Sequence, residues 1–335
     1  MTKSVLGHVD ITKFLFAVGI VAIHSGCFAG NDLFSWTIMH GVLRLAVPFF
    51  FCAAGYFFYK SLKKSNNIKV TTQKYIKRLL IPFVFWLTIN LPVVVVGYLN
   101  DGNSIIKILL KLMRDLVFYP WGAMWFVSAL IVAVLLIVPF YKKHKLKKAV
   151  VIGLVLYLVG LVFNTYYFVV HGTPLQGFVD AILQFAGSMR NGVFEGMFFV
   201  SIGMYTTELQ SERRINRTAN MIVLFISYIL LLVEVILVKD LLHADDSSLF
   251  VAFIAVIPCL FLFLSELPTL KIDTKPFRNY STGVYFSHRF FLAIIMFLLK
   301  PYNSVIGFAL TFSIAMVVLT ILYKIDNEKI NYVIR

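Results

Sequence analysis

Ten apolar stretches, separated by short polar loops, constrain this chain more than any other feature. Most of them approach the length of about 20 residues that a helix needs to cross a bilayer. Strands of a membrane barrel would alternate apolar and polar residues, whereas these runs are unbroken. The sequence therefore predicts an all-α polytopic membrane protein with about 10 transmembrane helices. The stretches cover residues 10–29, 36–59, 76–99, 122–141, 149–170, 192–206, 218–239, 247–265, 279–299 and 303–323.

Composition supports the same class. Of the 335 residues, 60% are hydrophobic and 14% are charged, against roughly 25% charged in a soluble domain. A soluble globule of this size cannot cover so much apolar surface, which excludes a cytosolic enzyme, a disordered protein and a disulfide-rich secreted module. The three cysteines lie inside apolar runs and lack metal-ligand spacing, so no metal site is expected. No long polar segment interrupts the chain, and we expect one membrane domain over residues 1–335.

The net charge of +15 is distributed unevenly between the loops. With ten crossings, 22 Lys and Arg residues fall on one side of the membrane and six on the other. Positive loops stay in the cytoplasm, so both termini are predicted to be cytoplasmic. Orientation accounts for the basic residues, and we expect the lipid bilayer rather than nucleic acid as a partner. The oligomeric state is left open by the sequence.

Two ionisable residues in the first stretch are candidates for function. Lys13 and His24 each cost on the order of 2.5–3.5 kcal/mol inside a bilayer, so they are expected to serve a purpose. Their separation of eleven positions is about three helical turns, or roughly 16 Å along the axis, and places them on one face. The structural alternative is a lysine that reaches the interface and a histidine that is simply packed.

The second stretch contains Arg44, which stays charged and needs an anionic partner or ligand. Pro48 follows it and is expected to kink the helix and free a backbone carbonyl. Arg44 either stabilises an anion in a reaction or pairs for structure with an acid such as Glu195 or Glu234. Glu195 lies at the outer edge of the sixth stretch, where it either joins a site or is a solvated helix end.

Several short segments, taken in order, point to a known family. They resemble motifs of the acyltransferase-3 family of membrane proteins, whose members have ten spans. Two departures are Lys13, where the family has Arg, and Ala54, where it has Ser. Lysine keeps the charge but loses the planar fork that grips a phosphate in two places. The matching segments are Asp10–Lys13 with His24, Arg44 with Val47–Phe51 and Gly55–Tyr56, Lys77–Pro82, Trp125–Phe126, and Tyr280–Tyr285 with His288.

The resemblance implies membrane O-acyl transfer, most simply O-acetyl transfer. The donor would be cytoplasmic acetyl-CoA or a similar acyl-CoA, and the acceptor a hydroxyl of an extracytoplasmic glycan or lipid-linked sugar of a bacterial cell envelope. His24 would act as base or acyl carrier, and Arg44 would stabilise the oxyanion. His288, Tyr285 and Glu195 would complete the catalytic set. Donor phosphates would meet four basic residues, which are Lys13, Lys74, Lys77 and Arg78.

Two other functions stay open at this point. Membrane domains similar to this family occur fused to serine racemase domains, which makes a carrier for a small amino acid such as L-serine an alternative. A sensor or assembly protein with a degenerate site is a third. Residues 103–115 are predicted to form an amphipathic helix on the outer membrane surface, or else a wall of an acceptor groove.

Overall fold

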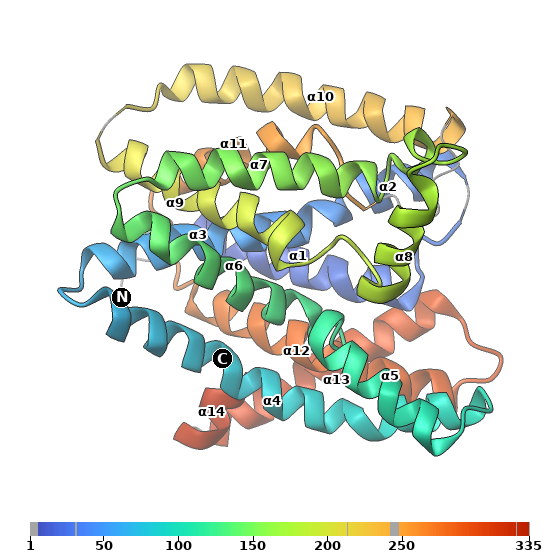
Figure 1. The fold of residues 1–335 in the computed structure, drawn as a ribbon. Coiled ribbons are helices and arrows are strands. Elements are labelled where there is room, and N and C mark those ends of the chain that lie inside the picture. The colour runs from blue at the N-terminus through green and yellow to red at the C-terminus, as the bar shows by residue number, and fades with distance from the viewer. Residues whose placement is uncertain (1–5, 31, 213, 242–247, 326, 335) are drawn as a thin grey trace. The chain divides into compact units, whose positions relative to one another are not determined.

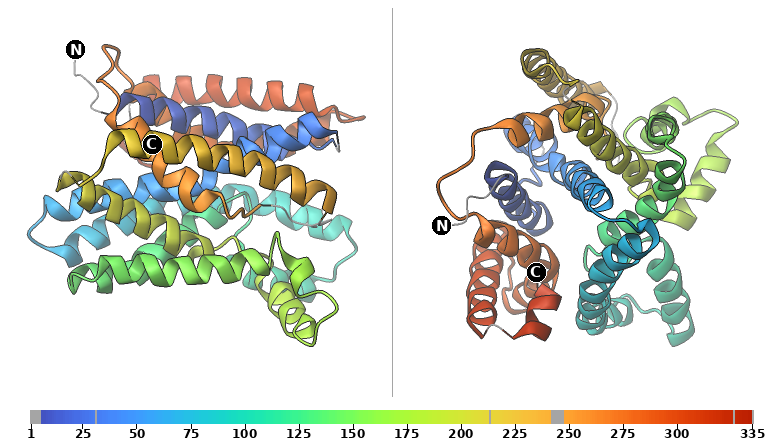
Figure 2. Two further views of the ribbon diagram at one scale, coloured as in Figure 1. Left: turned by 90° about the horizontal axis from the view of Figure 1, so that it is seen from above. Right: turned by 90° about the vertical axis from the view of Figure 1, so that its left-hand side faces the viewer.

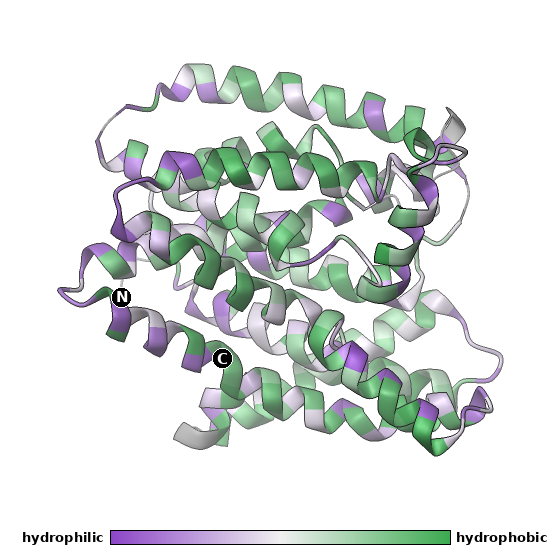
Figure 3. Cartoon of the chain, in the orientation of Figure 1, coloured by the Kyte–Doolittle hydropathy of each residue, from purple (hydrophilic) through white to green (hydrophobic). Residues whose placement is uncertain are grey.

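The computed structural model describes residues 6–30, 32–212, 214–241, 248–325 and 327–334. Within these ranges the chain forms helices joined by turns and loops, without strands (Figure 1). Apolar residues dominate the helices, and polar residues gather in the connections and at helix ends (Figure 3). The prediction of an all-α polytopic membrane protein is confirmed.

Each of the ten apolar stretches contains a helix, but the helices differ in length. Among the described residues, seven helical segments are long and apolar enough to cross a membrane. The other three stretches hold α7, α9 and α11, with 17, 15 and 14 residues. Length alone therefore supports seven crossings, and ten crossings remain a prediction.

The chain divides into two compact units, each assembled from separate segments. The first unit contains residues 1–30, 78–127 and 269–335, and the second contains residues 31–77 and 128–268. The helices of the first unit are α1 (Gly7–Ser25), most of α4 (Ile68–Asn100), α5 (Ile105–Phe118), α12 (Lys275–Leu298), α13 (Ser304–Ile325) and α14 (Glu328–Ile334). Those of the second are α2 (Leu33–Gly41), η1 (Leu43–Leu45), α3 (Ala46–Lys63), most of α6 (Trp125–Lys142), α7 (Leu146–Val162), η2 (Tyr167–Val169), α8 (Gln176–Ala186), η3 (Gly192–Gly196), α9 (Met197–Ser211), α10 (Arg217–Leu241) and α11 (Phe253–Glu266).

In the first unit, α1 packs along α12, and α12 packs along α13 (Figure 2). Phe14 of α1 meets Phe277 of α12 edge to face, with ring centroids 5.6 Å apart. The α12–α13 pair is antiparallel, because the Tyr323 hydroxyl near the end of α13 donates to the carbonyl of Asn279 near the start of α12 at 2.8 Å. This three-helix layer carries four of the nine predicted site residues, which are Lys13, His24, Tyr285 and His288.

In the second unit, α3 and α9 approach so closely that only glycine fits at two positions. A Cβ atom on Gly203 of α9 would lie 2.1 Å from the carbonyl oxygen of Cys52, and one on Gly55 of α3 would lie 2.2 Å from that of Val200. Small residues allow such close backbone packing in membrane helices, where the resulting van der Waals contact drives association. Large aromatic side chains fill the space around this contact, among them fully buried Phe49 and Phe199.

Helix directions bear on the number of crossings. The α1–α12 pair is parallel, since its contacts run from Asp10–Thr274 to His24–His288 with rising numbers on both helices. If only the seven longest segments crossed, α12 would be the sixth and would run opposite to α1. If α7, α9 and α11 also cross, α12 is the ninth and runs with α1. The observed directions therefore do not fit seven crossings and agree with ten, a number that remains a prediction.

The amphipathic helix expected at residues 103–115 is α5, which begins after the N-cap Ser104. Its apolar side chains are largely uncovered, with Ile105 and Ile106 each 73% exposed, whereas Ile108 is buried. An apolar face open to the surroundings fits a helix lying in a membrane interface. The location of α5 on the outer surface remains a prediction.

Candidate active site

Two histidines from the first unit form the centre of the site. The rings of His24 in α1 and His288 in α12 are stacked, with centroids 5.2 Å apart and planes 29° apart. His288 is fully buried, and His24 is half-buried. The sequence predicted functional roles for both residues, and the fold brings them together.

The hydrogen bond at His288 defines which ring nitrogen is available. Its Nδ1 lies 2.6 Å from the backbone carbonyl oxygen of Tyr285. A carbonyl only accepts, so Nδ1 carries the hydrogen and Nε2 holds the lone pair in the neutral ring. Nε2 is buried and has no hydrogen-bond partner among the described residues. The arrangement leaves a basic nitrogen beside a second imidazole, in a setting from which water is largely excluded.

Polar contacts between α1 and α12 recur every seven residues along α12. The hydroxyl of Thr274 donates to the buried carboxylate of Asp10 at 3.0 Å. The Ser281 hydroxyl donates to the backbone carbonyl of Lys13 at 3.0 Å, and His288 is the next member of this row. Residues seven apart return to the same face of a helix, which explains the alignment. Sequence reasoning missed Thr274, although this spacing of polar residues was a signal that could have found it.

Lys13 lies on the same helix as His24, toward its N-terminal end. The charges that act on Lys13 come from Asp10 and from Arg278 of α12. Arg278 is exposed and was not among the predicted donor-binding residues. The α1–α12 interface thus carries two cations at one end and two imidazoles further along.

The other predicted donor-binding residues lie on α4. Lys74, Lys77 and Arg78 are all exposed and lie within the first three turns of this 33-residue helix. Lys74 and Lys77 belong to the second unit and Arg78 to the first. They form a basic segment that a polyanion can reach, and their role as phosphate ligands stays a prediction.

Arg44 occupies a break in the second apolar stretch. Helix α2 ends at Gly41, the 3₁₀ turn η1 holds Arg44, and α3 resumes at Ala46. Pro48 lies in the first turn of α3, where proline is tolerated because its missing N–H has no partner in the helix. The interruption therefore precedes the proline, and it places a charged residue at irregular backbone, as often occurs at functional sites in membrane proteins.

Glu195 is also presented by irregular backbone. It lies in η3, a π-helical turn, and is 1% exposed. The side-chain amide oxygen of Asn191 accepts hydrogen bonds from the N–H groups of Val193 and Phe194 and so caps the turn. The alternative of a solvated helix end for Glu195 is wrong, because the residue is buried. Arg44 and Glu195 both belong to the second unit.

Glu234, considered as a structural partner for Arg44, has a different role. Its carboxylate accepts hydrogen bonds from the backbone N–H groups of Val251 and Ala252 at 2.6 and 2.9 Å, and from the Tyr166 hydroxyl at 2.5 Å. These amides precede α11, so the carboxylate caps the N-terminus of that helix and opposes its dipole.

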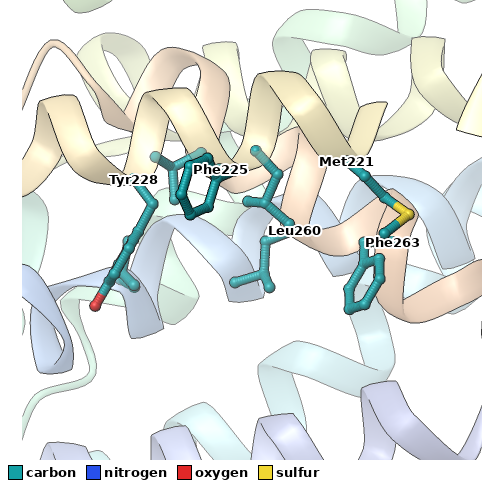
Figure 4. Close-up of a pocket in the computed structure, with 8 residues that line it drawn as sticks. Met221, Phe225, Tyr228, Leu260 and Phe263 are labelled. Carbon is teal, nitrogen blue, oxygen red and sulfur yellow. The ribbon is translucent and has the colours of Figure 1, made fainter. Parts of the chain in front are cut away.

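The second unit also contains an apolar cavity of about 360 Å³ between α10 and α11. Tyr228 supplies the one polar side chain of its lining, together with Phe225, Leu260 and other apolar residues (Figure 4). A lining of this kind suits an alkyl chain and offers no charged group to a zwitterion. Among the described residues no cluster of three or more His, Cys, Asp or Glu side chains could hold a metal ion.

Comparison with protein families gives a match that covers nearly the whole chain. The model of the acyltransferase-3 family, described as an acyltransferase domain, matches residues 6–324. The chain belongs to the acyltransferase-3 family. The recognition made from the short motifs is therefore confirmed, and membership supports membrane acyl transfer as the activity.

The curated relatives of this acyltransferase-3 protein share about a quarter of its residues. A serine/alanine racemase of Enterococcus gallinarum is 25% identical over 88% of this chain and 40% of its own length. An amino-acid racemase of Enterococcus faecalis is 26% identical over 83% of this chain and 39% of its own length. The chain thus spans less than half the length of these relatives. No solved structure matches it.

Proposed function

We propose that this protein moves an acyl group, most simply acetyl, from cytoplasmic acyl-CoA to a hydroxyl of an extracytoplasmic glycan or lipid-linked sugar. The single observation that carries the proposal is the stacked pair of His24 and His288 within an apolar bundle. One imidazole can serve as the general base for the hydroxyl, and a second can carry the acyl group, in acyl transfer from a thioester to a hydroxyl. The family assignment supports the reaction class.

The chemistry balances with these residues alone. An imidazole nitrogen removes the proton of the acceptor hydroxyl while the oxygen attacks the thioester carbonyl carbon. The C–S bond then breaks, and the CoA thiolate takes the proton back from the imidazolium, which leaves an ester and free CoA. In the two-step variant, a nitrogen of His24 attacks the thioester carbonyl, the C–S bond breaks, and CoA leaves as a thiol with the proton lost by the acylated ring. His288 then removes the proton of the acceptor hydroxyl while its oxygen attacks the acyl carbon. The C–N bond breaks, and the proton passes from His288 to the released His24 ring.

The second unit offers two further groups. A fixed guanidinium such as that of Arg44 would stabilise the tetrahedral oxyanion, and its place in a helix break agrees with such a use. The buried carboxylate of Glu195 would contact the acceptor or balance that charge. Both assignments are proposals.

At the opposite end of α1, Lys13 and Arg278 provide positive charge for a phosphate-bearing donor. The family's arginine at position 13 would grip a phosphate with two parallel hydrogen bonds, whereas lysine acts as a point charge. We therefore propose that Lys13→Arg tightens binding of acyl-CoA, and that Lys13→Ala weakens it.

A carrier for a small amino acid is the second candidate. The names of the relatives, serine/alanine racemase and amino-acid racemase, favour it, as does the charged residue in a broken helix at Arg44. A carrier would bind L-serine and would have no use for a thioester.

Calorimetry on the full chain in nanodiscs separates the two candidates. Acetyl-CoA, CoA and L-serine would be titrated into the wild type, Lys13→Ala and His24→Ala. We expect acetyl-CoA and CoA to bind the wild type and His24→Ala, and to bind Lys13→Ala at least about tenfold more weakly, the loss of one charged hydrogen bond. Binding of L-serine without any response to acetyl-CoA or CoA would overturn the acyltransferase proposal.

A further inference from the structure

The short turn between α5 and α6 has unusual backbone geometry. Gly122 and Ala123 both adopt left-handed conformations, with φ of 67° and 64°. Glycine accepts this region freely, but an alanine there is strained by its Cβ atom. A residue holds such a conformation only when its surroundings enforce it, and strained backbone of this kind gathers at functional sites.

Helix α4 holds one side of this turn. The indole Nε1–H of Trp121 donates to the carbonyl of Leu87 at 2.8 Å. The side chain of Asn90 lies directly over Gly122, so that a Cβ atom there would be 3.0 Å from it. Asn90 is itself fixed, because its amide donates to the carbonyl of Trp86 at 2.8 Å. The turn is therefore clamped against α4 through two side chains.

On its other side the turn contacts α12 through Tyr285. The strained conformation directs the carbonyl of Ala123 to the hydroxyl of Tyr285, which donates a hydrogen bond to it. The Tyr285 ring also meets Phe126, which follows the turn, edge to face at 5.6 Å. Tyr285 is 7% exposed, so this contact is shielded from competing solvent.

Tyr285 contacts His288 in two ways. Its backbone carbonyl receives the Nδ1 hydrogen of His288, and its ring lies beside the imidazole with centroids 6.0 Å apart. A chain of contacts thus leads from α4 through the turn and Tyr285 to His288 and on to His24. Every member of this chain lies in the first unit.

We propose that the turn of Trp121–Met124 is a positioning device for the histidine pair, acting through the Ala123–Tyr285 hydrogen bond to hold His288 with Nε2 as its basic nitrogen. Tyr285 is then a positioning residue, because its hydroxyl hydrogen is already used by Ala123. The proposal rests on the proposed acyl transfer for its purpose, but the orientation of His288 can be measured without any turnover.

The test uses the full chain in nanodiscs, labelled with ¹⁵N at histidine. The signal of His288 is assigned by its loss in His288→Asn, and the nitrogen shifts report which ring nitrogen carries hydrogen. The key variant is Tyr285→Phe, which removes one oxygen atom. Tyr323→Phe is the matched control, because it also removes a tyrosine hydroxyl that donates to a backbone carbonyl of α12. Ala123→Gly keeps the carbonyl and relieves the strain.

We expect the wild type, Tyr323→Phe and Ala123→Gly to show His288 protonated at Nδ1 alone. Tyr285→Phe should show a mixture of the two tautomers, and its kcat for CoA release from acetyl-CoA should fall about tenfold with KM unchanged, since one hydrogen bond is lost. Trp121→Phe releases the far side of the turn and should shift the tautomers in the same direction. This second variant keeps the test decisive if Tyr285→Phe does not fold.

A single Nδ1 tautomer with wild-type kcat in both Tyr285→Phe and Trp121→Phe would overturn the positioning role. Loss of the tautomer in Ala123→Gly would also overturn it, because that variant retains the carbonyl. If Tyr285→Phe shifts the tautomer but the wild type releases no CoA, the acyl transfer is refuted and the positioning role of the turn remains supported.

Discussion

The α1–α12 interface and the α3–α9 interface hold parallel helices together by different means. The first contains a row of polar contacts, with Thr274 on Asp10, Ser281 on Lys13 and the two stacked histidines. The second relies on glycine at positions 55 and 203, where backbone meets backbone. Small residues are enough to pair membrane helices, whereas buried polar residues add a cost in hydrocarbon. The proposed acyl transfer would give the polar interface a purpose that offsets this cost.

The largest effect is expected from breaking the glycine interface. In Gly203→Ala the new Cβ atom would meet the Cys52 carbonyl oxygen at 2.1 Å, and neither backbone can yield. We expect the variant to lose its monodisperse peak in size-exclusion chromatography in detergent. Gly97→Ala is the control, because nothing lies within 4 Å of a Cβ atom there, and it should be stabilised by up to about 1 kcal/mol. A wild-type elution profile and melting temperature for Gly203→Ala would show that the contact is not close.

The next effect falls on the polar interface and concerns activity. His288→Asn should lower kcat for acyl transfer by about 10²–10⁴-fold, the usual contribution of a general base, with a melting temperature close to that of the wild type. The control is His40→Asn, since His40 is also buried, with Nδ1 3.0 Å from the carbonyl oxygen of Trp36. Equal losses of activity in both variants would show that loss of any buried histidine lowers activity, and would contradict a specific role for His288 in the polar interface.

A smaller effect is expected at the polar cap of the second unit. Glu234→Gln replaces a carboxylate that accepts hydrogen bonds from two backbone amides before α11. We expect the free energy of unfolding to fall by roughly 1–2 kcal/mol, measured by thermal unfolding in detergent. Glu212→Gln, which breaks only an exposed pair with Arg214, should change it by less than about 1 kcal/mol. A larger loss in Glu212→Gln would contradict the capping role.

The smallest effect is expected from Ser281→Ala, which deletes one hydrogen bond to the Lys13 carbonyl. Interhelical hydrogen bonds in membranes contribute about 0.6 kcal/mol on average, so the melting temperature should fall only slightly. Thr282→Ala is the control, because that hydroxyl bonds within its own helix. Complete unfolding of Ser281→Ala would mean that the polar row, and not packing, holds α1 to α12.

The sequence was enough to predict the helical membrane class, because apolar runs and loop charges report directly on a bilayer. It also marked His24 and His288 as candidates for function, since ionisable side chains are rare in apolar stretches. Their contact could not be predicted, because it depends on the parallel packing of the first and ninth stretches. The left-handed conformation of Ala123 could not be predicted either, because alanine is not a residue type that favours positive φ.

The break around Arg44 shows a different limit. Pro48 was expected to interrupt the helix, yet the interruption lies ahead of it, at η1. Proline fits the first turn of a helix without strain, so the residue marked a helix start rather than a kink. The burial of Glu195 depended on the π-helical turn, which local sequence does not specify.

The central claim is that the His24–His288 pair transfers an acyl group from CoA to the far side of the membrane. The most direct test uses inverted membrane vesicles that contain the protein and receive acetyl-CoA labelled with ¹⁴C in the acetyl group. We predict that label becomes vesicle-bound with the wild type and His40→Asn, and stays in solution with His24→Asn and His288→Asn. Transfer by both pair variants at the wild-type rate, or no transfer by the wild type, would contradict the account.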